Sequence, residues 1–154
     1  MLNNFQNYIT SISKFFTITF FILLILTVLL QVVSRFFFTQ APAWTEELSR
    51  VFFIYSVSFS CGLGILNNSY ISINIFKKKF SKHSQFLVEK FIQFSIITFM
   101  VLFQFQSIKF LQVGALQTSP SLGINMFWFY FPILIIPSSI MCFFIFQFFN
   151  KKIN

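Results

Sequence analysis

The charged residues between positions 35 and 50 are the side chains of this sequence best placed to do chemistry. Arg35 closes a long apolar run, and Glu46, Glu47 and Arg50 follow it. A charge inside a bilayer costs about 2.5–3.5 kcal/mol on insertion scales, so we expect Arg35 to pair with an acid, Glu47. Glu46 and Arg50 have the i, i+4 spacing of a favourable helical ion pair. The sequence therefore predicts a structural ion cluster of Arg35, Glu46, Glu47 and Arg50.

Two interpretations of this cluster stay open. It is either an ordinary solvated helix at the membrane surface, or a clamp that fixes the first two apolar segments against each other or against a partner protein. Thr45 can cap the start of a helix whose dipole favours the two acids in its first turn. Because arginines would neutralise the acids, we assign the cluster no catalytic role and no role in cation transport.

Other kinds of reaction centre lack the residues that they need. The single histidine, His83, lies in a lysine-rich stretch, so it cannot supply paired haem ligands from facing helices. Cys61 and Cys142 are isolated and form no C-x-x-C motif of a disulfide oxidoreductase. The segment 15–34 contains no acid of the kind that a proton-coupled drug exporter requires. We therefore expect no enzyme activity, no cofactor and no metal.

The composition indicates that lipid is the solvent of this chain. Of its 154 residues, 56% are hydrophobic and 9% are charged, and the mean hydropathy is +0.80. Soluble domains carry about 25% charged residues, and so few charges cannot cover an apolar core with a polar surface. The net charge of +8 would suggest nucleic acid in a soluble protein. Here the basic residues lie mostly at the ends of apolar runs, so we expect no nucleic-acid partner.

Four apolar segments predict an all-α integral membrane protein that forms a single domain over residues 1–154. The expected transmembrane helices cover about 15–38, 51–66, 86–111 and 124–149. The polar stretch 43–50 is expected to form an interfacial amphipathic helix that leads into the second span. Residues 67–85 are expected to form a loop. A cleaved signal peptide is the alternative for the first segment, but the apolar run is too long and no small-x-small site follows it.

The distribution of basic residues predicts which side of the membrane each end occupies. Cytoplasmic segments carry an excess of lysine and arginine, and four spans place both termini on one side. Most basic residues lie on the side that holds the termini and the loop 67–85, so both are predicted to be cytoplasmic. Those residues are Lys14, Lys77, Lys78, Lys79, Lys82, Lys90, Lys151 and Lys152. The lysine run could instead mark a site for anionic lipid or a partner.

Small residues recur at helical spacing along the second span. They are Ser56, Ser58, Ser60, Gly62 and Gly64. Small side chains let membrane helices approach closely, and close packing is a main source of their association energy. The pattern fits a tight interface with a partner and the core of this chain's own bundle equally well.

Two further sets of residues are typical of packing and anchoring. Gln93 and Gln104 form a polar stripe in the third span, where hydrogen bonds between helices are the expected use. Trp44, Trp128 and Tyr130 lie next to span ends. Such aromatic rings prefer the boundary between lipid and water, so these three residues are predicted interfacial anchors in contact with membrane lipid.

The order of motifs resembles one transporter family. An arginine closes the first span, W-x-E-E-L-x-R follows at 44–50, and T-S-P-x-L-G-I occurs at 118–124. With its length and four predicted spans, the chain resembles the small membrane subunit, the Q component, of tripartite ATP-independent periplasmic (TRAP) transporters. This resemblance covers nearly the whole chain.

The resemblance implies a division of labour within the bacterial inner membrane. A large membrane subunit would bind the substrate and sodium and would move, while a periplasmic substrate-binding protein would deliver an organic acid, such as a C4-dicarboxylate or sialic acid. The small subunit would support the large one. A membrane anchor or assembly factor, or an autonomous homo-oligomeric channel, is the alternative. The residues that select the transported acid are expected on other chains.

Overall fold

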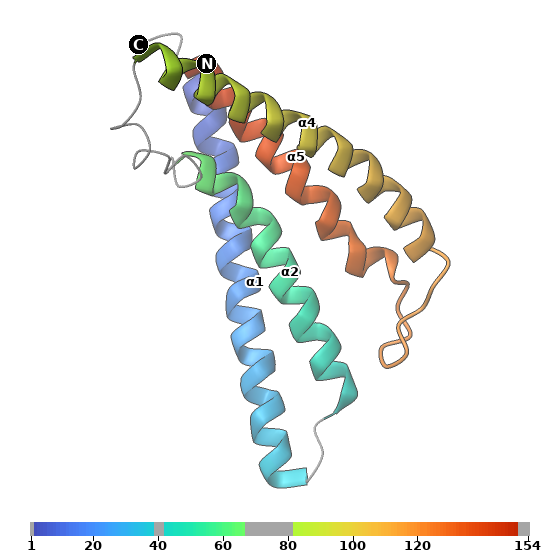
Figure 1. Cartoon of the computed structure of the whole chain (residues 1–154). Coiled ribbons are helices and arrows are strands. Elements are labelled where there is room, and N and C mark those ends of the chain that lie inside the picture. Colours follow the sequence, from blue (N-terminus) through green and yellow to red (C-terminus); the bar gives the residue numbers. More distant parts are fainter. Residues whose placement is uncertain (1, 39–41, 67–81, 151–154) are drawn as a thin grey trace.

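The computed structural model describes residues 2–38, 42–66 and 82–150, and within these ranges every regular element is a helix (Figure 1). The helices are α1 (Leu2–Phe38), α2 (Ala43–Leu66), α4 (Lys82–Gly114) and α5 (Phe127–Asn150). Each contains a segment long and apolar enough to cross a membrane: Gln6–Phe37, Ala43–Ile65, Lys90–Gly114 and Phe127–Ile145. The predicted all-α fold with four long apolar helices is confirmed.

The helix bounds differ from the sequence expectations in several places. The stretch 43–50, expected as an interfacial helix that leads into the second span, forms one continuous helix with that span, α2. Helix α4 begins at Lys82, inside the loop predicted at 67–85, and residues 67–81 of that loop lie outside the described residues. Helix α5 begins at Phe127 and not at 124, because the Asn125 side chain accepts the Phe127 N–H and caps the helix start.

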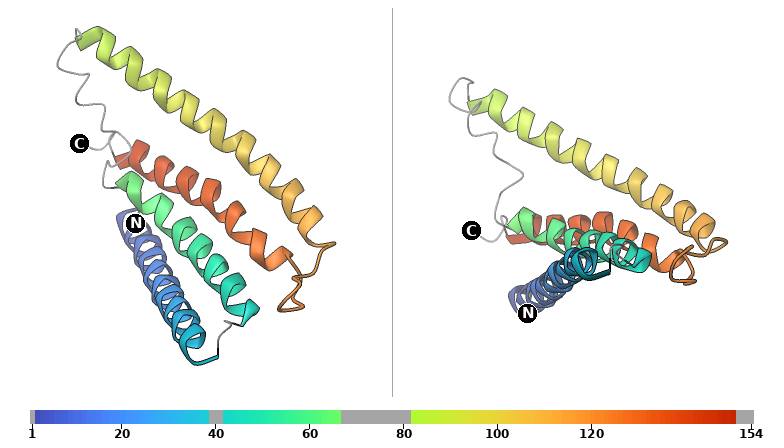
Figure 2. Two further views of the ribbon diagram at one scale, coloured as in Figure 1. Left: turned by 60° about the horizontal axis from the view of Figure 1, so that its bottom comes forward. Right: turned by 90° about the horizontal axis from the view of Figure 1, so that it is seen from below.

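The helices form two antiparallel hairpins that lie side by side. In space their order is α1, α2, α5, α4, with the principal contacts between α1 and α2, between α2 and α5, and between α5 and α4 (Figure 2). Helices α2 and α5 therefore occupy the middle, and most side chains of α1 and α4 are exposed. The start of α1 and the end of α5 lie at one end of the molecule, and the turn between α4 and α5 lies at the other (Figure 1).

Helix α1 packs on α2 through a repeat of seven residues. Ser13, Thr27 and Ser34 are buried on its inner face, and Phe20 occupies the remaining position of the repeat. The ring of Phe20 stacks on Tyr55 of α2, with centroids 4.8 Å apart. A spacing of seven keeps one face of a helix against a nearly antiparallel neighbour, and small polar residues on that face permit a close approach.

Helix α2 packs on α5 around a glycine. A Cβ atom at Gly62 would lie 2.4 Å from Cδ2 of Phe143 and 3.1 Å from the carbonyl oxygen of Ser139. Phe143 is only 1% exposed and forms the core with Ile65 and Ile140. The absence of a side chain at position 62 is therefore what admits the Phe143 ring between the two helices.

Two prolines inside α5, Pro132 and Pro137, connect this helix to both of its neighbours. A proline has no N–H, so the carbonyl four residues earlier loses its donor within the helix. For Pro132 that carbonyl belongs to Trp128, and the hydroxyl of Tyr55 on α2 donates to it at 2.9 Å. For Pro137 it belongs to Ile133, and the hydroxyl oxygen of Ser107 on α4 lies 3.4 Å away. Tyr55 thus satisfies the carbonyl that Pro132 frees. The Ser107 hydroxyl lies nearer to the Phe103 carbonyl of its own helix, at 2.8 Å.

Candidate functional site

The start of α2 presents two adjacent acids to different surroundings. Successive residues on a helix point about 100° apart, so neighbours in sequence face different partners. Trp44 and Glu46 are exposed, Thr45 is fully buried, and Glu47 is half-buried. Thr45 was expected to cap the helix, but α2 begins at Ala43 and the Thr45 hydroxyl donates to the carbonyl of Pro42 at 2.7 Å.

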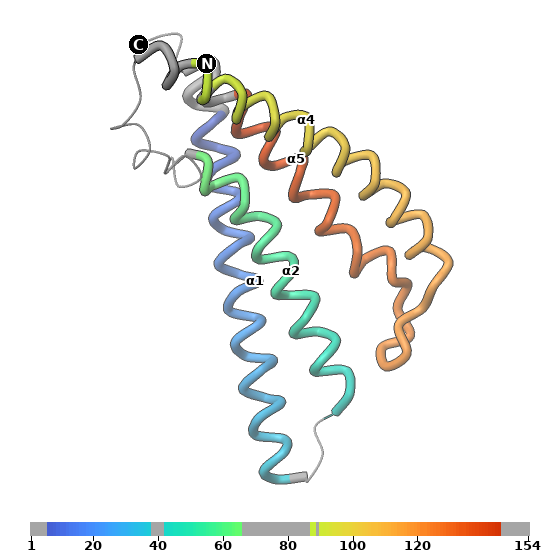
Figure 3. The backbone as a smooth tube through the Cα atoms, in the orientation of Figure 1, coloured from blue at the N-terminus to red at the C-terminus, as the bar shows by residue number. Residues whose placement is uncertain are grey.

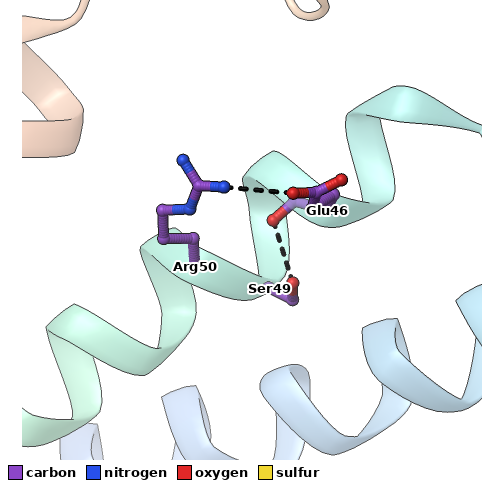
Figure 4. A network of polar contacts seen from close by, with 3 residues as sticks. All are labelled: Glu46, Ser49 and Arg50. Atoms are coloured by element: carbon purple, nitrogen blue, oxygen red, sulfur yellow. Dashed lines mark hydrogen bonds and ion pairs between the residues drawn. The ribbon is translucent and has the colours of Figure 1, made fainter.

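Glu46 forms an ion pair within its own helix (Figure 4). Its Oε1 lies 3.1 Å from an Nη atom of Arg50, and the two side chains are 66% and 67% exposed. The hydroxyl of Ser49 donates to the Glu46 carbonyl at 2.9 Å. An exposed i, i+4 pair contributes about 0.3–0.5 kcal/mol in water. The predicted Glu46–Arg50 spacing therefore produces a local pair that does not join α2 to another helix.

Glu47 contacts the turn between α4 and α5, far away in the sequence. The hydroxyl of Ser119 donates a hydrogen bond to Oε2 of Glu47. Ser121 and Leu122 lie beside the carboxylate, and the Leu122 N–H donates to the Ser119 hydroxyl oxygen at 3.2 Å. We call Glu47, Ser119, Ser121 and Leu122 the Glu47 cluster. It joins the W-x-E-E-L-x-R motif to the T-S-P-x-L-G-I motif.

The turn between α4 and α5 forms a loop at the ends of both helices (Figure 3). Backbone hydrogen bonds hold this turn, which contacts Glu47, in shape. The N–H of Ser119 donates to the carbonyl of Ile124 at 2.8 Å, and the N–H of Gly123 donates to the carbonyl of Ser119 at 3.0 Å. Gly123 has φ 65°, a left-handed conformation that glycine adopts without strain. Ser119 itself is buried. These hydrogen bonds give the turn that contacts the Glu47 carboxylate a defined conformation.

The predicted pairing of Arg35 with Glu47 is not what the structure contains. Among the residues that the structure describes, no ion pair joins these two side chains. Arg35 is exposed in the last turn of α1, whereas the carboxylate of Glu47 accepts a hydrogen bond from the Ser119 hydroxyl of the α4–α5 turn. A hydrogen-bond donor of a turn therefore takes the place that the sequence assigned to an arginine.

Two of the small residues of α2 contact α5 of this chain. Ser58 is fully buried, and its carbonyl lies 3.3 Å from the hydroxyl of Ser139 on α5. Ser58 and Gly62 therefore face α5, where Phe143 fills the space beside the glycine. Ser56 is buried, and Ser60 and Gly64 are half-buried. At Ser58 and Gly62, small size serves packing within the chain.

The polar stripe and the aromatic residues have the following surroundings. Gln104 is half-buried, and its Oε1 lies 3.1 Å from the hydroxyl of Ser138 on α5. Gln93 is half-buried on α4. Trp44 and Trp128 are exposed near helix starts, while the Tyr130 ring packs on Phe110 with centroids 4.4 Å apart.

The described residues contain no group of three or more His, Cys, Asp or Glu that could hold a metal ion.

Sequence reasoning missed two contacts of this region. It singled out both motifs of the Glu47 cluster but had no signal that residues 47 and 119 meet. It also did not identify Tyr55 as the donor for the carbonyl that Pro132 leaves free. A proline inside a predicted membrane helix does indicate an unpaired carbonyl four residues earlier. Only the fold identifies Tyr55 as its partner.

Asn125 is expected to stabilise the turn through both ends of its side-chain amide. Its Oδ1 accepts the Phe127 N–H at 2.8 Å, and its Nδ2 donates to the carbonyl of Ala115 at 2.8 Å. Asn125→Ala should lower the free energy of unfolding by about 1–2 kcal/mol through loss of the cap and the second bond. Asn125→Asp keeps the acceptor and should lie between Ala and wild type in detergent unfolding followed by circular dichroism. Equal stability of Asn125→Ala and wild type would contradict this role.

Comparison with known proteins places the chain among membrane transport components. A family model described as "Tripartite ATP-independent periplasmic transporters, DctQ component" matches residues 24–153. A protein of Haemophilus influenzae named "Putative TRAP transporter small permease protein" is 23% identical over 141 residues, which cover 92% of this chain and 84% of that protein. The family match includes both motifs that meet at the Glu47 cluster.

Proposed function

Because the chain belongs to the DctQ component family of TRAP transporters, we propose that it braces the large membrane subunit of such a transporter. The chain is a small TRAP transporter subunit and a multi-pass membrane protein. In this proposal the large subunit binds substrate and sodium and moves, and this chain provides no translocation route of its own. A periplasmic binding protein delivers an organic acid, such as a C4-dicarboxylate or sialic acid.

The use of polar side chains inside the helices is the observation that supports a bracing role. Glu47 contacts the α4–α5 turn, Tyr55 donates to α5, and Gln104 lies against a hydroxyl of α5. Each of these groups is engaged with another segment of the same chain. A translocation route instead needs intramembrane polar groups that bind and release a solute. The family assignment fits a component protein, not an enzyme.

We further propose an orientation in a bacterial inner membrane. The excess of basic residues near the chain ends and the segment 67–85 favours cytoplasmic termini. The Glu47 cluster then lies toward the periplasmic side. Trp44, Trp128 and Tyr130 lie close to the same end and suit the boundary between lipid and water. The first turns of α2 would lie at this boundary.

Affinity purification from native membranes tests the proposed function. A tag on the full chain should co-isolate a larger multi-pass membrane protein in mild detergent, and the pair should remain together through size-exclusion chromatography. Recovery of the chain only as a homo-oligomer, from cells in which it is expressed at its natural level, would contradict the bracing role. The family match makes a hetero-complex the expected result.

Substitution of the acids should change how much is transported but not which acid is transported. Glu46→Ala and Glu47→Ala are each expected to reduce complex assembly or uptake. The preference among acids should stay the same, because both residues lie at the start of α2 and not in a substrate site. Uptake rates for a panel of carboxylates, measured in cells that carry the complete transporter, should fall in the same proportion for every acid. A changed order of preference would count against the bracing role.

A further inference from the structure

The two helix hairpins of this chain diverge toward the end that holds the Glu47 cluster. Figure 1 and the left view of Figure 2 show α2 and α5 close together near the end of α2 and farther apart near its start. At the close end, Gly62 admits the ring of Phe143. Tyr55 of α2 contacts Trp128 in the first turn of α5. Nearer the start of α2, another contact joins the two hairpins.

The turn between α4 and α5 supplies this contact. Residues 115–126 fold back from the ends of both helices toward the start of α2 (Figure 1). Glu47 lies one turn into α2 and accepts a hydrogen bond from the Ser119 hydroxyl, with Ser121 and Leu122 of the same turn beside it. Tyr55, two turns further along α2, makes the next hydrogen bond to α5. The Glu47 cluster is thus the connection nearest the diverging end.

In the Glu47 cluster a hydrogen-bond donor, and not a cation, binds the carboxylate. The Ser119 hydroxyl donates to the carboxylate, and the backbone N–H of Leu122 donates to the same Ser119 oxygen at 3.2 Å. The turn itself is held by bonds from Ser119 to Ile124 and from Gly123 to Ser119. Hydrogen bonds to a charged acceptor are stronger than those between neutral groups. The carboxylate of Glu47 therefore binds a turn that is already held in shape. This one contact fixes the two hairpins relative to each other.

We propose that the Glu47 cluster locks the two hairpins into one rigid body, so that removal of the carboxylate frees the α1–α2 hairpin to swing relative to the α4–α5 hairpin. That a rigid chain helps to brace the large subunit rests on the proposed function. The lock itself is a property of the isolated chain. The exposed pair of Glu46 and Arg50, one residue away on the same helix, takes no part in the lock.

Spin labels on the full chain in lipid nanodiscs test the lock directly. Phe36 and Leu116 are 84% and 88% exposed, and they lie on different hairpins at the diverging end. With Cys61 and Cys142 replaced by alanine, cysteines at these two positions carry the labels. Wild type should give one narrow distance distribution by pulsed electron paramagnetic resonance. Glu47→Ala and Ser119→Ala should each give a broader distribution with a shifted mean.

Controls separate a loss of the lock from a loss of the fold. Glu46→Ala removes a neighbouring carboxylate and should leave the distribution narrow. A label pair at Phe36 and Phe53, both on the α1–α2 hairpin, should be unaffected by every variant, and helicity by circular dichroism should stay constant. An unchanged Phe36–Leu116 distribution in both lock variants, or equal broadening by Glu46→Ala, overturns the proposal. Because no partner is present, the result is independent of whether a large subunit co-purifies.

Discussion

Gly62→Ala is expected to destabilise the chain substantially, although it adds one methyl group. The new Cβ would lie 2.4 Å from Cδ2 of Phe143 and 3.1 Å from a backbone oxygen of α5, so the helices must separate or the buried ring must move. Such overpacking costs about 1–3 kcal/mol in well-packed cores. Chemical unfolding in detergent, followed by circular dichroism, should show this loss of free energy.

A smaller side chain at position 143 provides the matched test. Phe143→Leu removes the ring atoms that the new Cβ would contact, and it costs some packing by itself because Phe143 is 1% exposed. The double variant Gly62→Ala, Phe143→Leu should therefore be more stable than the sum of the two single effects predicts. Strictly additive losses would show that the contact between these residues does not set the separation of α2 and α5.

Tyr55→Phe is expected to have the second large effect, because it leaves a backbone carbonyl without a donor. The Tyr55 hydroxyl donates to the carbonyl of Trp128, which Pro132 deprives of its partner within α5. An unsatisfied carbonyl costs about 1–3 kcal/mol where water cannot reach it. The free energy of unfolding of Tyr55→Phe in lipid nanodiscs should fall by this amount.

Pro132→Ala distinguishes this explanation from a general loss of packing. Alanine restores an N–H at position 132, so the Trp128 carbonyl regains a donor within its own helix. In a Pro132→Ala background, Tyr55→Phe should therefore be nearly neutral. If Tyr55→Phe costs as much in that background as in wild type, then the hydroxyl acts through something other than the carbonyl of Trp128.

Local patterns in the sequence predict the elements of this fold. The long apolar runs predict helices in the right places, and the ion pair of Glu46 with Arg50 follows from an i, i+4 spacing within one helix. The apolar segment begins at 124, three residues before the start of α5 at Phe127. For this reason the sequence placed the start of the helix too early. Asn125 and the backbone bonds of the turn determine the actual start.

Contacts between distant segments are beyond these patterns. Glu47 and Ser119 are 72 positions apart, and the sequence supplies no reason to prefer a turn hydroxyl over the arginine that precedes Glu47. The same limit applies to Gly62, whose small size predicts a close approach but not Phe143 as the group that approaches. Periodicity shows which face of a helix is special, and only the order of helices in space shows what lies against it.

Reconstitution into liposomes tests most directly whether this chain is a brace without a route of its own. The purified full chain, alone in vesicles with an inward sodium gradient, should accumulate no carboxylate above the level of protein-free vesicles. Vesicles that also contain the co-isolated large subunit and the binding protein should accumulate their substrate, and omission of this chain should abolish that uptake. Gradient-driven accumulation by this chain alone would contradict the account.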